Sequence, residues 1–113
     1  MTPLDLKPTI KLSIMNPLSE ENALFGPGIA ALCRGVRSTG SLNAAAKNMG
    51  MAYSKAWRII KETEESLGMQ MLVRDGAHGS TLTDECITLL DAYDNLSKRL
   101  QTESERLYKE VIS

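Results

Sequence analysis

Two short helical patterns joined by a glycine, between Ser41 and Lys61, constrain the fold more than any other stretch of the chain. The first pattern contains three consecutive alanines, residues 44–46, which favour a helix and occupy little space. Gly50 follows, and glycine accepts the positive φ with which a helix often ends. The second pattern keeps its apolar side chains on one side: Ala56, Ile59 and Ile60. This arrangement predicts two helices that cross steeply and in close contact.

The outward side of the second predicted helix, residues 52–67, is polar and cationic. It carries Tyr53, Ser54, Trp57, Arg58 and Lys61. A two-helix unit of this kind can place such a face in a DNA major groove, where arginine reads guanine and lysine more often meets phosphate. The alternative is a solvated helix face, and for Trp57 core packing and groove contact are equally open. The DNA interpretation requires Arg58 and Lys61 to stand clear of the interior and of acidic side chains in the same molecule.

The charge is distributed unevenly along a chain whose net charge is only −1. Residues 1–83 carry nine Lys and Arg against seven Asp and Glu, whereas residues 84–113 carry four against seven. The positive charge is therefore local, and the whole protein is not a generally basic binder of nucleic acid. The cations expected to neutralise phosphates are Lys47, Lys55, Lys61 and Arg74. Ser41 is a further candidate phosphate contact, although capping the first helix explains it equally well.

Before the two-helix unit, the sequence predicts a lead-in, a hairpin and a helix. Residues 1–8 contain two prolines and are predicted to be a flexible lead-in. Thr9–Met15 alternates polar and apolar residues and predicts a half-buried strand, with Ala23–Phe25 as its short partner in an N-terminal β-hairpin. A proline in the first turn then begins a core helix over residues 26–38.

After Gly68, two short apolar segments flank the turn GAHG and predict a wing, a small hairpin beside the second helix of the unit. Arg74 and His78 flank its tip and are expected to touch a minor groove or phosphates, unless the hairpin is only structural. Thr83 is predicted to cap a last helix over residues 84–110.

That last helix is longer than the small core can cover. Its apolar residues recur at spacings of three and four, which favours pairing with a second copy in a two-fold homodimer. The residues expected to dimerise are Ile10, Leu12, Ile14, Tyr93, Leu96, Leu100 and Leu107.

Composition excludes several other classes of protein. With 113 residues and 42% hydrophobic content, the chain is long enough for one domain. It has no apolar run of membrane-spanning length and no signal-peptide pattern at its start, so we expect a cytoplasmic protein. Cys33 and Cys86 are expected to be free buried thiols rather than a disulfide or a metal site, and with one histidine we expect no cofactor. No nucleophile elbow or phosphate loop is present, so we do not expect an enzyme.

Several phrases of the sequence resemble a known family. They are GPG at Gly26–Gly28, TGSLNAAAKNMGMAYSKAWRII at Thr39–Ile60, LGMQMLVR at Leu67–Arg74, and Leu82 with Thr83. Together they resemble the N-terminal DNA-binding domain of the molybdate-responsive ModE regulators, over about residues 9–95, with the LysR-type winged helix-turn-helix as a more distant relative. The resemblance implies a homodimeric transcription factor that binds double-stranded DNA.

The sequence departs from that family in ways that bear on specificity. No oxyanion-binding domain follows, so we expect no direct molybdate sensing and allow for a separate effector-sensing protein or for thiol chemistry at the cysteines. Ala52 stands where the family has a capping serine, which removes about 1 kcal/mol of helix start unless Ser54 substitutes. Cys86 replaces a customary glycine, and Thr63 a common leucine.

The sequence thus predicts an α+β, mainly α, winged helix-turn-helix with an N-terminal β-hairpin and a long C-terminal dimerisation helix. The predicted organisation is a lead-in at 1–8, the winged domain at 9–83 and the dimerisation helix at 84–113. The competing function is a winged-helix module that binds protein and not DNA.

Overall fold

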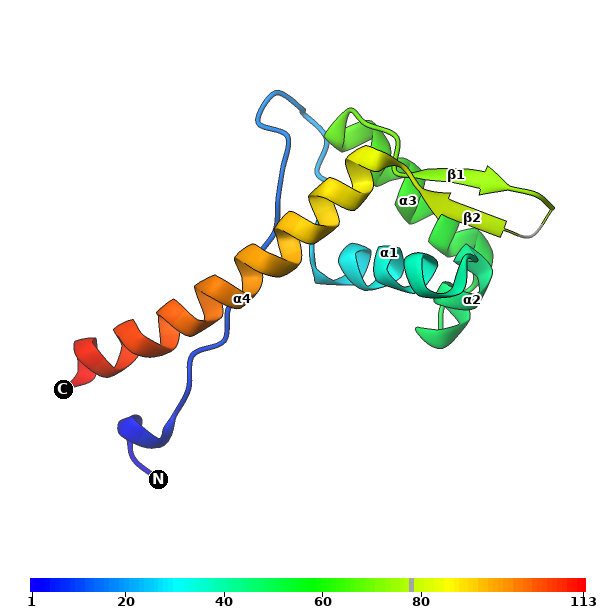
Figure 1. Ribbon diagram of the computed structural model, residues 1–113. Helices are drawn as coiled ribbons and strands as arrows, with labels where there is room; N and C mark the ends of the chain where they lie inside the picture. The colour runs from blue at the N-terminus through cyan, green and yellow to red at the C-terminus, as the bar shows by residue number, and fades with distance from the viewer. Residues whose placement is uncertain (78) are drawn as a thin grey trace.

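Three helices and a hairpin form the body of the protein, and a fourth helix projects from it (Figure 1). The computed structural model describes residues 1–77 and 79–113. Its elements are η1 (Pro3–Asp5), α1 (Pro27–Thr39), α2 (Leu42–Asn48), α3 (Tyr53–Leu67), β1 (Leu72–Asp75), β2 (Gly79–Leu82) and α4 (Asp84–Ile112). Among the helices of this described part, none combines the length and apolarity needed to cross a membrane. The predicted helices and wing are confirmed.

The helix boundaries follow local signals in the sequence. The Ser41 hydroxyl accepts from the backbone N–H of Ala44 at 3.1 Å, and the Thr83 hydroxyl accepts from that of Cys86 at 3.1 Å. Each of these caps satisfies an amide that has no partner inside its helix. At the other end of α3, Gly68 takes a φ of 72°, which glycine adopts without strain.

The core lies where α1, α2 and α3 meet under the hairpin and the start of α4. It consists of Phe25, Ile29, Ala30, Leu32, Cys33, Val36, Leu42, Ala45, Ala46, Ala56, Ile60, Met71, Leu72, Cys86, Leu90 and Tyr93. Within it α1 and α2 approach closely, because a Cβ added at Gly35 would lie 2.7 Å from the Cβ of Ala45. The small residues of the two helices are therefore what allows them to approach.

The first strand of the hairpin, β1, is shorter than the apolar segment that the sequence predicts from Met69 onward. β1 and β2 pair antiparallel from Leu72 opposite Leu82 to Asp75 opposite Gly79, and residues 69–71 lie outside the strand. The Glu64 carboxylate instead accepts from the backbone N–H groups of Met71 and Leu72, at 2.7 and 3.3 Å. A side chain of α3 thus fixes the start of the hairpin.

The predicted N-terminal β-hairpin is reduced to one bridge, a correction to the prediction. Ile14 and Phe25 exchange two backbone hydrogen bonds of 2.9 Å, and no regular strand forms over 9–15. Side chains of α4 bind the backbone of this segment instead. Gln101 donates to the carbonyl of Pro8 at 2.7 Å and accepts from the N–H of Ile10 at 2.9 Å.

Residues 1–15 run beside α4, so that both termini lie at the same end of the molecule (Figure 1). The Tyr93 hydroxyl donates to the carbonyl of Leu12 at 2.8 Å, and the Tyr108 hydroxyl donates to that of Pro3 at 2.6 Å. The predicted flexible lead-in, residues 1–8, therefore includes a turn of 3-10 helix that is tied to α4.

Two ion pairs seat α4 on α1. The Arg34 guanidinium donates twice to Asp94, at 2.7 and 3.2 Å, and Arg37 donates to Asp91 at 2.9 Å. The two arginines and the two aspartates are each three residues apart, so both pairs lie along one line between the helices. The bidentate Arg34 pair adds geometric specificity to the seat.

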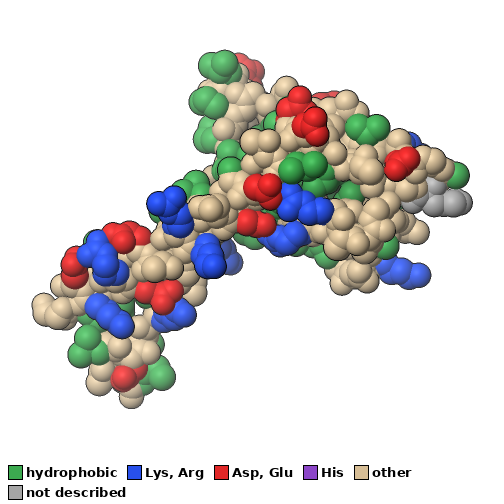
Figure 2. All heavy atoms as spheres, viewed as in Figure 1, with side chains coloured by type: hydrophobic (Ala, Val, Ile, Leu, Met, Phe, Trp, Pro, Cys, Tyr) green, Lys and Arg blue, Asp and Glu red, His purple; other side chains and the backbone are tan. Residues whose placement is uncertain are grey.

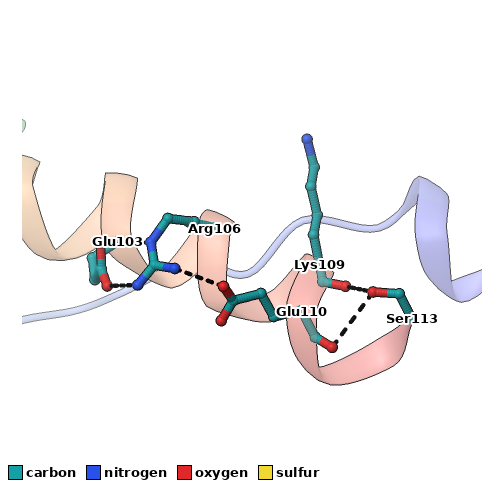
Figure 3. A network of polar contacts seen from close by, with 5 residues as sticks. All are labelled: Glu103, Arg106, Lys109, Glu110 and Ser113. Atoms are coloured by element: carbon teal, nitrogen blue, oxygen red, sulfur yellow. Dashed lines mark hydrogen bonds and ion pairs between the residues drawn. The ribbon is translucent and has the colours of Figure 1, made fainter.

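The far half of α4 extends beyond the body. The radius of gyration is 16.7 Å, against roughly 13 Å expected for a compact domain of this length. Acidic and basic side chains are interspersed over the projecting part of the molecule (Figure 2). Near its end Arg106 bridges Glu103 and Glu110, and Ser113 donates to the carbonyls of Lys109 and Glu110 (Figure 3).

The close approach of α1 to α2 predicts opposite effects for two glycines of α1. Gly35→Ala should lower the free energy of unfolding, because the clash with Ala45 costs about 1–3 kcal/mol and exceeds the helix gain of about 1 kcal/mol. Gly28→Ala is the matched control, since nothing lies within 4 Å of its added Cβ. Urea unfolding followed by circular dichroism measures both variants, and a Gly35→Ala protein as stable as Gly28→Ala would contradict the packing described.

Candidate nucleic-acid interface

The outward face of α3 is open to solvent over its first three turns. Ala56, Ile60, Thr63 and Ser66 are buried, whereas Tyr53, Ser54, Lys55, Arg58 and Lys61 are exposed. The buried Thr63, at a position expected to be apolar, has its hydroxyl satisfied by the carbonyl of Ile59 at 2.8 Å. The 3.6-residue period of the sequence therefore sorts the two faces of α3 as predicted.

A groove of about 560 Å³ separates this face from the hairpin. Its walls come from α3 and from the strand side of the hairpin. They comprise Ser54, Trp57, Arg58, Lys61, Gln70, Leu72 and Arg74. We call this the α3–wing groove. Three of its seven lining residues are cations, and five were predicted from the sequence as DNA contacts.

Trp57 belongs both to the groove and to the edge of the core. Its ring packs against the core cluster, yet its side chain lines the groove and stays half-buried. The Cζ of Arg74 lies 5.0 Å and the Nζ of Lys61 5.3 Å from the ring centroid, both within cation–π range. Its indole N–H is buried and has no hydrogen-bond partner within residues 1–77 and 79–113. The two alternatives that the sequence left open are thus combined.

A second opening of about 320 Å³ lies at the start of α3. Ser41, Asn43, Tyr53, Arg74 and Ala77 line it, so Arg74 borders both spaces. Ser41, Tyr53 and Arg74 come from three different elements, and the crossing of α2 and α3 brings them together. The Ser41 hydroxyl accepts from Ala44 as the cap of α2, and its O–H can still donate, so capping is compatible with a phosphate contact.

Both cations at the centre of α3 have acidic neighbours, whereas the DNA interpretation of the sequence required Arg58 and Lys61 to be clear of acidic side chains. Arg58 pairs with Glu62 at 3.4 Å, and Lys61 pairs with Glu64 at 3.2 Å. Each cation nevertheless remains 61% exposed, so neither is sealed under another segment. Glu62 is also exposed, and an exposed helix pair contributes only about 0.3–0.5 kcal/mol, so a phosphate or a base edge can replace this carboxylate beside Arg58. Glu64 is only 11% exposed and is held by the backbone of Met71 and Leu72, so it stays beside Lys61. Both pairs lower the net positive charge of the face.

The remaining candidates fall into three groups. Lys47 and Lys55 are exposed but line neither opening. His78 lies outside the described residues. Gln70 and Asn43 line the two openings but were not predicted. Asn43 stands two residues after the cap of α2, a position that could have indicated it, whereas no sequence signal distinguishes Gln70.

The residues predicted for dimerisation differ in how far they are buried in the protein. Tyr93 is a correction, because its ring packs edge-on against Phe25 in the core and its hydroxyl binds Leu12, leaving it unavailable to a partner. Leu12 and Ile14 pack half-buried against the core. The exposed members of the predicted set are Ile10, Leu96, Leu100 and Leu107.

Cys33 and Cys86 are free and buried, as predicted, with their sulfur atoms 3.8 Å apart between α1 and α4. The hydrogen bond with Cys86 and burial raise the pKa of Cys33, so this thiol stays protonated. Within the described ranges, no three side chains of His, Cys, Asp or Glu gather in a way that could hold a metal ion.

Two crossed helices, a third helix behind them and a hairpin beside an open helix face define a winged helix-turn-helix. Comparison with known proteins agrees with this class. Residues 31–86 match the family model of the bacterial regulatory helix-turn-helix protein, lysR family. They span α2, α3, the hairpin and most of α1.

Among solved structures, the fold is similar to the CbnR DNA-binding domain in the crystal structure of its complex with DNA. The TM-score is 0.58 with 21% sequence identity, and the match covers 73% of this chain and 93% of that one. A search of curated protein sequences found no match.

The start of α3 allows a test of helix capping. The residue before it, Ala52, makes no side-chain cap, and Ser54 does not replace it. We expect Ala52→Ser to raise the free energy of unfolding by about 1 kcal/mol and Ser41→Ala to lower it by a similar amount. Thermal unfolding of both variants checks the pair. If Ala52→Ser has no stabilising effect, the amides at the start of α3 do not lack a partner.

Proposed function

We propose that this protein is a sequence-specific, DNA-binding transcriptional regulator whose helix α3 enters the major groove of double-stranded DNA. The observation that carries the proposal is the α3–wing groove, where Arg58, Lys61 and Arg74 converge on one exposed surface. The lysR-type match over residues 31–86 supports the same class of protein. The similar structure, CbnR, was solved with DNA, which supports a duplex as the partner here.

The proposed roles follow from exposure and from side-chain chemistry. Tyr53, Ser54 and Arg58 occupy the exposed first turns of α3 and are placed nearest the bases, together with Trp57. A guanidinium can donate two parallel hydrogen bonds to guanine, so Arg58 is the candidate for reading sequence. The phosphates are assigned to Lys47, Lys55, Lys61 and Arg74. Affinity should therefore fall steeply as salt rises.

We further propose that the protein acts as a homodimer on a two-fold operator. From its middle onward, α4 leaves Leu96, Leu100 and Leu107 about two-fifths exposed, at 43%, 38% and 43%. A second copy of α4 would cover these leucines and place two α3 helices on one duplex. Ile10 is also exposed, and the hydrogen bond from its backbone N–H to Gln101 holds it beside α4.

The finer family assignment is also part of the proposal. The phrase around Tyr53, Ala56, Trp57 and Arg58 favours a ModE-type regulator, whereas the matching family model is the lysR one. We propose a cytoplasmic regulator with no catalytic role and no bound cofactor. Its effector signal, if it has one, would come from a separate sensing protein.

One observation favours a second function, a protein-binding module. The two central cations of α3 are paired with Glu62 and Glu64, which weakens the attraction of this face for phosphate. Selection of bound fragments from genomic DNA, with and without added molybdate, separates the two functions. We expect enrichment of a two-fold motif that molybdate does not change. The absence of any enriched motif would favour the protein-binding module.

Arg58 tests the proposed reading of sequence. Arg58→Ala should reduce discrimination among operator variants at one base position per half-site, by about tenfold, because a bidentate contact contributes roughly 1–3 kcal/mol. Lys55→Ala is the matched control, since it should weaken binding to all sequences equally and lower the salt slope. Fluorescence anisotropy with a panel of operator variants measures both. Unchanged discrimination in a folded Arg58→Ala protein would remove Arg58 from this role.

The dimer can be tested at the exposed leucines of α4. Sedimentation at micromolar concentration should show a dimer for the wild type and a monomer for the double variant Leu100→Glu and Leu107→Glu, because two buried carboxylates would oppose pairing. Leu18→Glu is the control, since Leu18 is 91% exposed and far from this face in sequence. A monomeric wild type would end the pairing proposal.

A further inference from the structure

Trp57 joins two elements that bear the cations of the groove. Lys61 follows Trp57 by one turn of α3, whereas Arg74 comes from β1. Both cations lie close to the same ring, with Nζ of Lys61 at 5.3 Å and Cζ of Arg74 at 5.0 Å from its centroid. Electrostatic attraction to an aromatic ring acts over this range, and tryptophan binds cations best among the aromatic residues. One indole thus contacts the cations of both the helix and the hairpin.

We propose that Trp57 is a positioning residue: its ring holds the Arg74 guanidinium and the Lys61 ammonium at the α3–wing groove, so that α3 and the hairpin meet the DNA backbone as one unit. Trp57 itself reads no base. This inference rests on the proposed DNA binding and revises the part that Trp57 takes in it.

The surroundings of the ring oppose direct base reading. The indole N–H is the only hydrogen-bonding group of the side chain, and it is buried without a partner among the residues that the structure describes. Tyr53 packs edge-on against the ring, with centroids 6.3 Å apart and an interplanar angle of 84°. The indole would have to leave both the core and Tyr53 to donate to a base edge. The ring faces that contact the cations need no such movement.

Holding the cations in advance favours binding. A free arginine or lysine side chain loses conformational entropy when it contacts a phosphate, because several of its rotatable bonds become fixed. Arg74 stands on the four-residue strand β1, where it borders both openings and its guanidinium lies over the indole of Trp57. Contact with the ring restrains it before DNA arrives, which reduces the entropy lost on association. Lys61 is restrained on a second side by Glu64, at 3.2 Å.

The contact can be tested first in the free protein. Trp57 is the only tryptophan of the chain, so its fluorescence reports on the ring alone. Arg74→Ala and Lys61→Ala should each change the emission intensity or maximum. Lys55→Ala is the control, because Lys55 is an exposed cation of α3 that does not line the groove. Emission that all three variants leave unchanged would overturn the contact.

A double-mutant cycle on the operator fragment tests the consequence. Trp57→Leu and Arg74→Ala should each weaken binding by about fivefold to tenfold. The double variant should bind with the same affinity as whichever single variant binds less tightly, because Trp57→Leu already removes the phosphate contact that Arg74 makes. The slope of log K against log salt should fall by about 0.9 for Arg74→Ala, the loss of one phosphate, and by more for Trp57→Leu, which also releases Lys61.

Two further variants keep this test decisive. Trp57→Phe should restore most of the affinity, because it keeps an aromatic face and removes the unpartnered N–H. It also serves if circular dichroism shows that Trp57→Leu is unfolded. Trp57→Leu combined with Lys55→Ala should instead give additive losses, since Lys55 does not contact the ring.

Three outcomes would overturn the inference. Additive losses for Trp57→Leu and Arg74→Ala would mean that the ring does not act through the arginine. A loss confined to particular operator variants, with the salt slope unchanged, would make Trp57 a base reader. A wild-type protein that binds no duplex would end the proposed function and this inference with it, while the fluorescence of the free protein would still decide whether the contact exists.

Discussion

The contact between α1 and α2 at Gly35 and Ala45 is the constraint on which the rest of the structure depends. On one side, α2 packs so closely against α1 that a Cβ at Gly35 would clash with Ala45. This approach fixes where α3 can begin. On the other side, α1 presents Cys33, Arg34 and Arg37 to α4. The carbonyl of Gly40, at the end of α1, also accepts from Ser80 of the hairpin at 2.8 Å. One helix, α1, therefore sets the positions of α3, the hairpin and α4.

The sequence could predict those parts of the fold that are specified by neighbours along the chain. Ser41 and Thr83 cap the helices they precede, and Gly68 ends α3, because each signal acts within one turn. The N-terminal segment could not be predicted in this way. Its alternating residues satisfy the rule for a strand, but its backbone binds Gln101, more than ninety residues away, in place of a partner strand. A contact at such separation has no local signature.

The candidate site shows the same division. The period of α3 predicted which of its residues face outward, and the same period places Glu62 four residues after Arg58 and Glu64 three after Lys61, where helix neighbours pair. It could not predict that Glu64 is largely buried, because this depends on the hairpin. Nor could it place Gln70 on the groove or put Arg74 beside Trp57, because both depend on the angle between α3 and the hairpin. That angle is fixed by Glu64, which binds the backbone of Met71 and Leu72.

The two thiols between α1 and α4 have a consequence for measuring motion in this protein. Neither sulfur reaches solvent, so an alkylating reagent can modify them only while the first turn of α4 is separated from α1. When closing is fast compared with the chemical step, the labelling rate equals the intrinsic thiol rate multiplied by the open fraction. The labelling rate of the two thiols thus reports the fraction of molecules in which α4 is detached from α1, and its measurement requires no engineered probe.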